Sequence, residues 1–175
     1  MNYSKKAMNI TPSITLAITA KAKELKGAGV DVVSFGAGEP DFNTPKNIMD
    51  AAIKSMEEGK TKYTPTSGII ELREAICKKL KEDNNLSYNS NQIIVSTGAK
   101  QCLADAFMAI LNPGDEVIVP IPYWVSYPEL IKLADGVPVF VEGKEENDYK
   151  YTLESLNKVV NDNTKACLLY TSDAA

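Results

Sequence analysis

The chain of 175 residues is 44% hydrophobic and 24% charged, and its formal net charge is −4. These values are typical of an ordinary folded domain and exclude a disordered chain, while the mixture of Lys and Glu leaves no basic stripe for nucleic acid. The sequence contains no His, which excludes Ser-His-Asp triads, HExxH zinc sites and histidine proton shuttles.

Apolar runs and cysteines bear on the location of the protein. The longest apolar runs, residues 102–111 and 117–125, fall short of the ~18 residues that span a membrane. The first residues lack the apolar core and cleavage site of a signal peptide, so we expect a cytoplasmic protein without a membrane segment. Cys77, Cys102 and Cys167 are odd in number and widely spaced, which predicts buried, unreactive thiols and neither disulfides nor a metal site.

The first half of the chain predicts three helices joined by loops. Residues 16–26 show a moderately amphipathic pattern that ends in glycine. A second helix is expected over residues 45–59, with Pro in its first turn and a cap candidate at residues 43–44. After a polar loop at residues 60–68, residues 69–82 place their apolar side chains at helical spacing and predict a third helix.

The second half alternates short apolar runs with helical segments. The runs that we predict as strands are residues 93–96, 117–120, 137–141 and 166–169. The predicted helices are residues 100–111, 126–133 and 153–160. The segment Asn112-Pro113-Gly114-Asp115 is a sharp turn between a helix and a strand. Continuous apolar strands separated by helices are typical of a parallel sheet covered on both faces, so the predicted fold class is α/β.

A glycine turn follows the first predicted strand, in Ser96-Thr97-Gly98-Ala99-Lys100-Gln101. A buried strand that turns at Gly98 into a helix directs free backbone N–H groups and the positive helix end at one point, which suits a phosphate. The alternative interpretation is a glycine that only makes the turn, and the motif alone favours that alternative. The dinucleotide motif GxGxxG and the P-loop motif are both absent.

Aromatic residues follow the next predicted strand, in Pro122-Tyr123-Trp124, which includes the only Trp of the chain. Ligands of open α/β sheets bind at this end of the strands. Trp124 could cap the sheet or stack on a flat heteroaromatic ring, and the residues alone leave both interpretations open.

Together, these segments resemble the class I/II aminotransferases, which are pyridoxal-phosphate-dependent enzymes of fold type I. The matching segments are Gly38-Glu39-Pro40-Asp41-Phe42, Lys62-Tyr63-Thr64-Pro65 with Gly68 and Leu72-Arg73, Ser96-Thr97-Gly98-Ala99-Lys100-Gln101, Asn112-Pro113-Gly114-Asp115-Glu116-Val117 and Pro122-Tyr123-Trp124. They occur in family order and at family spacing between Ser13 and Leu169. The chain is most similar to the bacterial aspartate aminotransferase subgroup.

The resemblance implies the front part of the fold-type-I architecture, an incomplete, mostly parallel sheet covered by helices. It implies that residues 1–40 form an N-terminal arm and part of the small domain, and that residues 41–169 begin the large cofactor-binding domain. Residues 170–175 do not match the family, and we interpret them as a truncation or a cloning junction. The Schiff-base Lys, the Asp at the pyridine nitrogen and the Arg for the α-carboxylate are expected beyond them. The chain alone is therefore predicted to be inactive and to hold no catalytic residue.

The resemblance also implies how the cofactor, pyridoxal 5′-phosphate, is bound. The backbone N–H groups of Gly98, Ala99 and Lys100 would hold the phosphate. Trp124 would stack on the pyridine ring and border the substrate. Tyr63 would reach the phosphate in the partner subunit of a homodimer with shared active sites, and the alternative is a plain loop tyrosine.

Two further roles concern the substrate. Gly38 would let the main chain approach the substrate α-carboxylate, which a Cβ would obstruct, and the alternative is a plain turn glycine. The Lys100 side chain would meet the distal carboxylate of aspartate or glutamate, whereas a lysine in most such turns is a solvated surface residue.

The implied reaction is a ping-pong transamination between an amino acid, with aspartate or glutamate favoured, and a 2-oxo acid. A C–S lyase or a decarboxylating relative is the nearest alternative, because a cofactor cradle alone does not fix the reaction. An aminotransferase-like regulator that binds ligand without turnover is another, although such regulators carry a basic DNA-binding module for which the first residues leave no room. The last alternative is an α/β fragment without a function of its own.

Overall fold

The computed structural model describes residues 2–36, 38 and 40–170, and these residues form two compact units. Residues 18–96 make one unit, which we call the helical unit. The described residues before 18 and after 96 make the other, which we call the sheet unit. Of the predicted tail at residues 170–175, only Tyr170 is described, and Glu39 of the motif at residues 38–42 also lies outside the described residues. The division into an arm, a small domain and a large domain stays a prediction.

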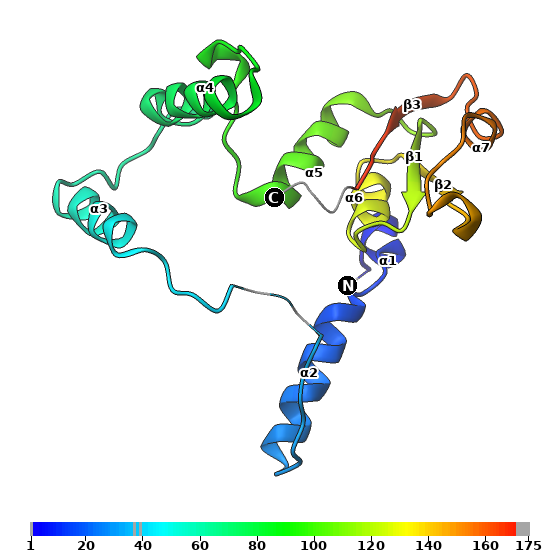
Figure 1. Cartoon of the computed structure of the whole chain (residues 1–175), viewed down its shortest axis with the longest axis horizontal. Helices are drawn as coiled ribbons and strands as arrows, with labels where there is room; N and C mark the ends of the chain where they lie inside the picture. The colour runs from blue at the N-terminus through cyan, green and yellow to red at the C-terminus, as the bar shows by residue number, and fades with distance from the viewer. Residues whose placement is uncertain (1, 37, 39, 171–175) are drawn as a thin grey trace. The chain divides into compact units, whose positions relative to one another are not determined.

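Three parallel strands form the centre of the sheet unit (Figure 1). They are β1 (Glu116–Ile121), β2 (Val137–Glu142) and β3 (Thr164–Cys167). The strand order is β2-β1-β3, with Ile118 of β1 opposite Val139 of β2 and Cys167 of β3. The prediction of a parallel sheet is confirmed, and three of its four predicted strands are present.

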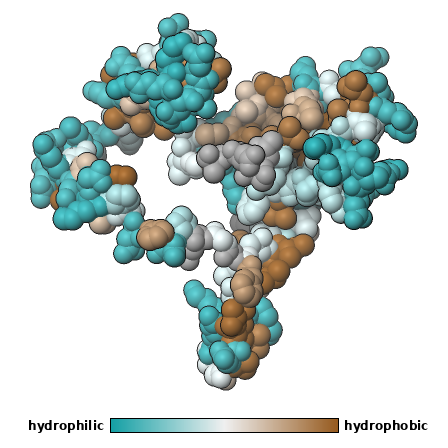
Figure 2. All heavy atoms as spheres, viewed as in Figure 1, coloured by the Kyte–Doolittle hydropathy of each residue, from teal (hydrophilic) through white to brown (hydrophobic). Residues whose placement is uncertain are grey.

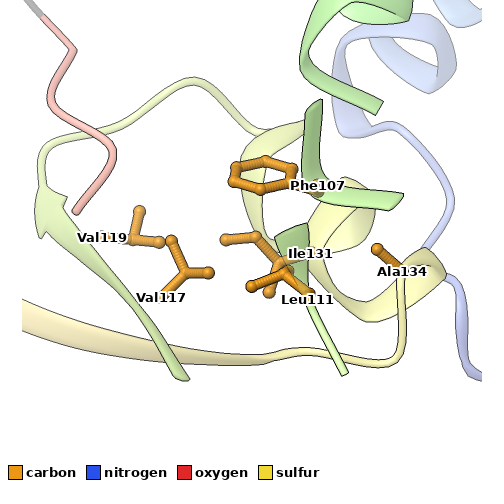
Figure 3. Close-up of a cluster of buried hydrophobic side chains, with 6 residues drawn as sticks. All are labelled: Phe107, Leu111, Val117, Val119, Ile131 and Ala134. Carbon is orange, nitrogen blue, oxygen red and sulfur yellow. The ribbon is translucent and has the colours of Figure 1, made fainter. Parts of the chain in front are cut away.

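Helices α5 (Gly98–Ile110) and α6 (Tyr127–Leu133) pack against one face of this sheet. Their apolar side chains join those of β1 in a single buried cluster, formed by Phe107, Leu111, Val117, Val119, Ile131 and Ala134 (Figure 3). Side chains alternate between the faces of a strand, so Val117 and Val119 point to the helices and Ile118, 2% exposed, is buried on the opposite face. Because β1 is buried on both faces, its sequence is a continuous run of apolar residues and not an alternation of apolar and polar ones.

Short elements complete the sheet unit. They are α1 (Lys5–Asn9), α7 (Leu153–Asn157) and the 3-10 helix η2 (Glu145–Asn147). The predicted sharp turn before β1 is present, because Gly114 has a φ of +93° and the backbone N–H of Asn112 donates to Asp115 Oδ2 at 2.8 Å. That hydrogen bond lowers the pKa of the Asp115 carboxyl below its usual value.

The helical unit contains little buried apolar surface. Its elements are most of α2 (Ile14–Gly27), then α3 (Lys46–Glu57), α4 (Ile70–Asn84) and the 3-10 helix η1 (Ser90–Gln92). None of the described residues in these three α-helices is buried. Large hydrophobic side chains are exposed along α2, as Figure 2 shows, and along α3, including Leu16, Ile18, Ile48 and Ile53.

Two local predictions in the helical unit are wrong. Residues 93–96 do not form a buried strand: Ile94 is 72% exposed, and the backbone N–H of Val95 donates to the Ser67 carbonyl. An apolar run becomes a strand only where another strand supplies a hydrogen-bonded ladder, and no strand among the described residues pairs with this one. The cap before α3 also differs, because Pro45 is the N-cap and no side chain caps it.

The cysteines are less buried than predicted. Cys77 is half-buried, whereas Cys102 and Cys167 are exposed, and all three are free thiols. Helical position alone does not bury a side chain, and Cys102 lies near the start of α5, before the residues that enter the core. Partial burial of its sulfur still raises the pKa of Cys167.

None of the described helices has both the length and the apolarity that crossing a membrane requires. Within the described residues, no three His, Cys, Asp or Glu side chains gather as a metal site would need.

Candidate functional site

Among the described residues, no acceptor meets the backbone N–H groups of Gly98, Ala99 and Lys100 in the first turn of α5. The N–H groups that open any α-helix have no partner within the helix, and here the N-cap Thr97 makes no side-chain cap. Gly98 has a φ of +80°, and no described atom lies within 4 Å of the position that a Cβ would take. The first turn also contains no acidic residue. This end of a 13-residue helix therefore offers donors, positive potential and space to an anion.

Lys100, in the same first turn, lines a pocket of the sheet unit of about 690 Å³. A volume of this size is in the range of small-molecule sites. The rest of the lining comes from the N-terminal segment at residues 10–14, the segment after β1, α6 and Phe140 of β2. Lys100 is exposed and forms no ion pair within the described residues. A cation without a carboxylate partner is thus available to a ligand in this pocket.

An aromatic pair forms part of the pocket lining. The rings of Tyr123 and Phe140 are stacked, with centroids 5.2 Å apart and planes inclined by 22°. Trp124 follows Tyr123 but does not line the pocket, and it is 43% exposed. The Trp124 carbonyl accepts a hydrogen bond from the N–H of Tyr127 at 2.9 Å, which ties this segment to the start of α6.

The N-terminal segment is held against α6 by polar contacts at two points. The backbone N–H of Thr11 donates to Glu129 Oε2 at 2.9 Å. Lys6 forms an ion pair of 2.6 Å with Asp135 and donates to the Leu133 carbonyl at 3.3 Å. These contacts place residues 10–14 at the pocket that contains Lys100.

Glu129 is a charged residue at this pocket that the sequence did not single out. Burial raises the pKa of Glu129, but hydrogen bonds from the Thr11 N–H and from Lys132 outweigh burial and bring its pKa below the usual value. The carboxylate is therefore ionised at neutral pH. No local pattern reveals this role, because Thr11 and Glu129 are 118 positions apart.

The remaining predicted site residues belong to the helical unit and do not line the pocket. Tyr63 is fully exposed, in the loop between α3 and α4. Gly38 is also exposed, and no described atom lies within 4 Å of where its Cβ would be. The structure thus brings Gly98, Ala99 and Lys100 together at one helix end, with Lys100 and the segment beside Trp124 at one pocket.

In parallel α/β proteins, a helix N-terminus beside a pocket is a place where anionic ligands can bind, and ligands commonly bind at the carboxyl ends of the strands. Residues 30–172 match the family model described as "Aminotransferase class I and II", and the chain belongs to this family.

Individual relatives agree with the family model. The chain is 58% identical to the aspartate aminotransferase of Bacillus sp. (strain YM-2) over 166 residues, which cover 95% of this chain and 42% of the relative. It is 57% identical to the aspartate aminotransferase of Bacillus subtilis (strain 168), covering 97% of this chain and 43% of the relative. The chain spans less than half the length of these curated relatives.

Solved structures give the same result for the fold. The structure of aspartate aminotransferase from Thermus thermophilus with maleate has a TM-score of 0.92 and 46% sequence identity, covering 97% of this chain and 44% of that one. The chain therefore has the N-terminal part of the fold-type-I architecture, as predicted. The family implies pyridoxal phosphate as cofactor, and the open donors at the start of α5 fit its phosphate group.

Proposed function

We propose that this chain is the N-terminal part of a pyridoxal-phosphate-dependent transaminase, which moves the amino group of an acidic amino acid to a 2-oxo acid. The observation that carries the proposal is the uncapped first turn of α5, whose Lys100 lines a pocket of small-molecule size. The family supports the reaction class, and the chain's similarity to two Bacillus aspartate aminotransferases supports aspartate as a substrate.

The cofactor phosphate would bind at the first turn of α5. The N–H groups of Gly98, Ala99 and Lys100 supply donors that lack helical acceptors. A helix end of this kind stabilises an anion by about 0.3 to 2 kcal/mol. The positive φ of Gly98 sets the turn, and the open space at its Cα lets a phosphate approach the main chain.

Trp124 would pack on the ring of the cofactor. When bound, pyridoxal phosphate supplies a conjugated ring that accepts the electron pair released at the Cα of the amino acid. Trp124 follows the carboxyl end of β1, where ligands of parallel sheets bind. An indole stacked there contributes about 0.5 to 1.5 kcal/mol beyond the burial of its area.

Lys100 would select the substrate. Its ammonium group lies at the pocket without a carboxylate partner among the described residues, so the distal carboxylate of aspartate or glutamate would be its counterion. The Thermus thermophilus relative was solved with maleate, which is a dicarboxylate.

Two residues of the helical unit would complete the site in a homodimer. The exposed Tyr63 would reach the cofactor phosphate of the partner subunit. Gly38, which also lacks close neighbours, would let the main chain approach the substrate α-carboxylate. Both roles and the dimer are proposed on the resemblance to the family, and a cytoplasmic location stays a prediction from the sequence.

The test uses an extended enzyme, in which residues 1–169 are joined to the remaining C-terminal part of the Bacillus subtilis relative. With pyridoxal phosphate, aspartate and 2-oxoglutarate, we expect oxaloacetate to form well above the rate of the free cofactor. Pyruvate and ammonia formed from cysteine-type substrates would indicate a C–S lyase instead, and carbon dioxide from aspartate a decarboxylase. Aspartate binding without any product would indicate a regulator.

A further inference from the structure

Arg73 is the only arginine in a chain that otherwise uses lysine for its positive charges. The chain has 19 Lys and Arg residues in total, so 18 of them are lysines. A single arginine against this background suggests a position at which a lysine could not do the same work. The family motif at residues 62–73 includes Arg73, but none of the roles proposed above uses it.

The guanidinium of Arg73 joins two loops through their backbone carbonyls. From helix α4, Arg73 Nε donates to the Gly68 carbonyl at 3.1 Å, and Nη1 donates to the Ser90 carbonyl at 2.9 Å. The side chain is half-buried and forms no ion pair within the described residues. Its role therefore depends on the geometry of its donors and not on an opposite charge.

A lysine would not reproduce these contacts. The guanidinium presents its N–H groups in a rigid planar fork, whereas an ammonium is a compact charge on a flexible stem. A lysine would have to reach both carbonyls from one nitrogen at the end of a flexible stem, whereas the guanidinium donates from two nitrogens that are fixed in one plane.

The loop that Arg73 holds carries Tyr63. Residues 60–68 lie in the connection between α3 and α4. The last part of this loop is also held by a second contact, because the Ser67 carbonyl accepts the N–H of Val95 at 3.1 Å. Gly68 has a φ of +96°, and a Cβ there would lie 3.0 Å from the Val95 side chain. Arg73 and Val95 together fix the C-terminal end of the loop, while Tyr63 remains exposed.

We propose that Arg73 is a positioning residue for Tyr63, because it holds the loop at residues 60–68 in the conformation from which Tyr63 reaches a phosphate. The proposal rests on the proposed function for the role of Tyr63 and on the two hydrogen bonds for the role of Arg73. In this proposal Arg73 supports cofactor binding only through Tyr63 and does not itself contact the cofactor.

The first experiment measures the loop directly. Lys60 and Lys62 are trypsin sites in the loop, so their cleavage in the native extended enzyme reports how often the loop opens. Arg73→Lys keeps the charge and should speed this cleavage about three- to tenfold through the lost hydrogen bond. The matched control is Lys78→Arg on the exposed side of α4, which should leave the rate unchanged. Cleavage of Arg73→Lys at the wild-type rate would overturn the proposal.

The second experiment measures the cofactor phosphate. Equilibrium affinities for pyridoxal phosphate and for pyridoxal, which lacks the phosphate, are compared in wild type, Arg73→Lys, Tyr63→Phe and the double variant. We expect Arg73→Lys to weaken pyridoxal phosphate about three- to tenfold, to leave pyridoxal unchanged, and to add nothing to Tyr63→Phe.

Three outcomes would overturn the positioning role. Equal weakening of both compounds, or an Arg73→Lys effect that adds in full to Tyr63→Phe, would reduce Arg73 to a structural residue. A Tyr63→Phe variant with unchanged affinity for pyridoxal phosphate would remove Tyr63 from the site. If oxaloacetate still forms in that case, the inference has failed while the proposed function stands.

Discussion

Glu129 Oε2 accepts a hydrogen bond from the backbone N–H of Thr11 at 2.9 Å, across 118 positions of the sequence. The contact links helix α6 to the N-terminal segment that lines the pocket beside Lys100. Because burial raises the pKa of Glu129 less than the Thr11 and Lys132 hydrogen bonds lower it, the folded pKa lies below the usual 4.5. The ionised Glu129 carboxylate contributes its full stabilisation above pH 4.5. This stabilisation is lost as the pH falls through the folded pKa.

The first prediction follows from this charge. At pH 7, Glu129→Gln exchanges a charge-assisted hydrogen bond for a neutral one, a loss of about 1 kcal/mol, so the N-terminal peptide should exchange its amide hydrogens about fivefold faster. As the pH is lowered from 7 to 3, wild-type Glu129 takes up protons, and the difference between the two proteins should shrink. Hydrogen exchange with mass spectrometry checks both, and Glu154→Gln, an exposed carboxylate, is the control. An undiminished difference at pH 3 would show that charge is not the cause.

The second prediction concerns the turn at Gly98. Alanine at a φ of +80° costs about 1 to 2 kcal/mol, so Gly98→Ala should distort the donors and weaken the extended enzyme's affinity for pyridoxal phosphate more than for pyridoxal. Gly29→Ala imposes a similar strain at a φ of +81° after α2, in the helical unit, and should leave both affinities unchanged. Equal effects of the two substitutions on cofactor affinity would count against a phosphate site at this turn.

The sequence alone predicts those elements whose structure depends on signals within their own residues. The apolar run of β1, the glycine turn before it and the helical spacing of α5 are local signals, and all three are present. Residues 93–96 were predicted wrongly because a strand also needs a neighbour, which no local pattern reveals.

The same limit applied to the candidate site. The donors at Gly98 and the cation at Lys100 were visible in one short motif, and the structure places them together. Glu129 and Phe140 were missed because they reach the pocket only through long-range packing. Tyr63 is proposed to contact the cofactor phosphate of the partner subunit, and a contact between two subunits is not indicated by any pattern within one chain.

The third prediction assigns substrate choice to Lys100. Replacing it with Ser in the extended enzyme removes a charge-assisted contact worth about 1.5 to 3 kcal/mol. The preference in kcat/KM for aspartate over alanine or phenylalanine should therefore fall about ten- to hundredfold. Lys132→Ser is the matched control, since Lys132 lines the same pocket but is paired with Glu129 at 2.9 Å. An unchanged preference in Lys100→Ser would leave specificity to other residues.

The fourth prediction tests the core on which the pocket is built. Ile131 is fully buried in the cluster between α5, α6 and β1, so Ile131→Ala should lower the free energy of unfolding by about 2 to 5 kcal/mol. Leu153→Ala removes a side chain of the same size at a site that is 79% exposed. It should change the free energy of unfolding by less than about 0.5 kcal/mol. Urea denaturation of the extended enzyme measures both. Similar losses for the two variants would contradict the described packing.

The fifth prediction concerns the amino group itself, and its measurement tests the proposed function most directly. The extended enzyme, loaded with pyridoxal phosphate, is given aspartate labelled with heavy nitrogen and unlabelled 2-oxoglutarate. Transamination predicts that the label appears in glutamate, with one oxaloacetate formed for each labelled glutamate and no labelled ammonia released. Labelled ammonia without labelled glutamate, or aspartate that binds and keeps its label, would contradict the assignment of this chain to a transaminase.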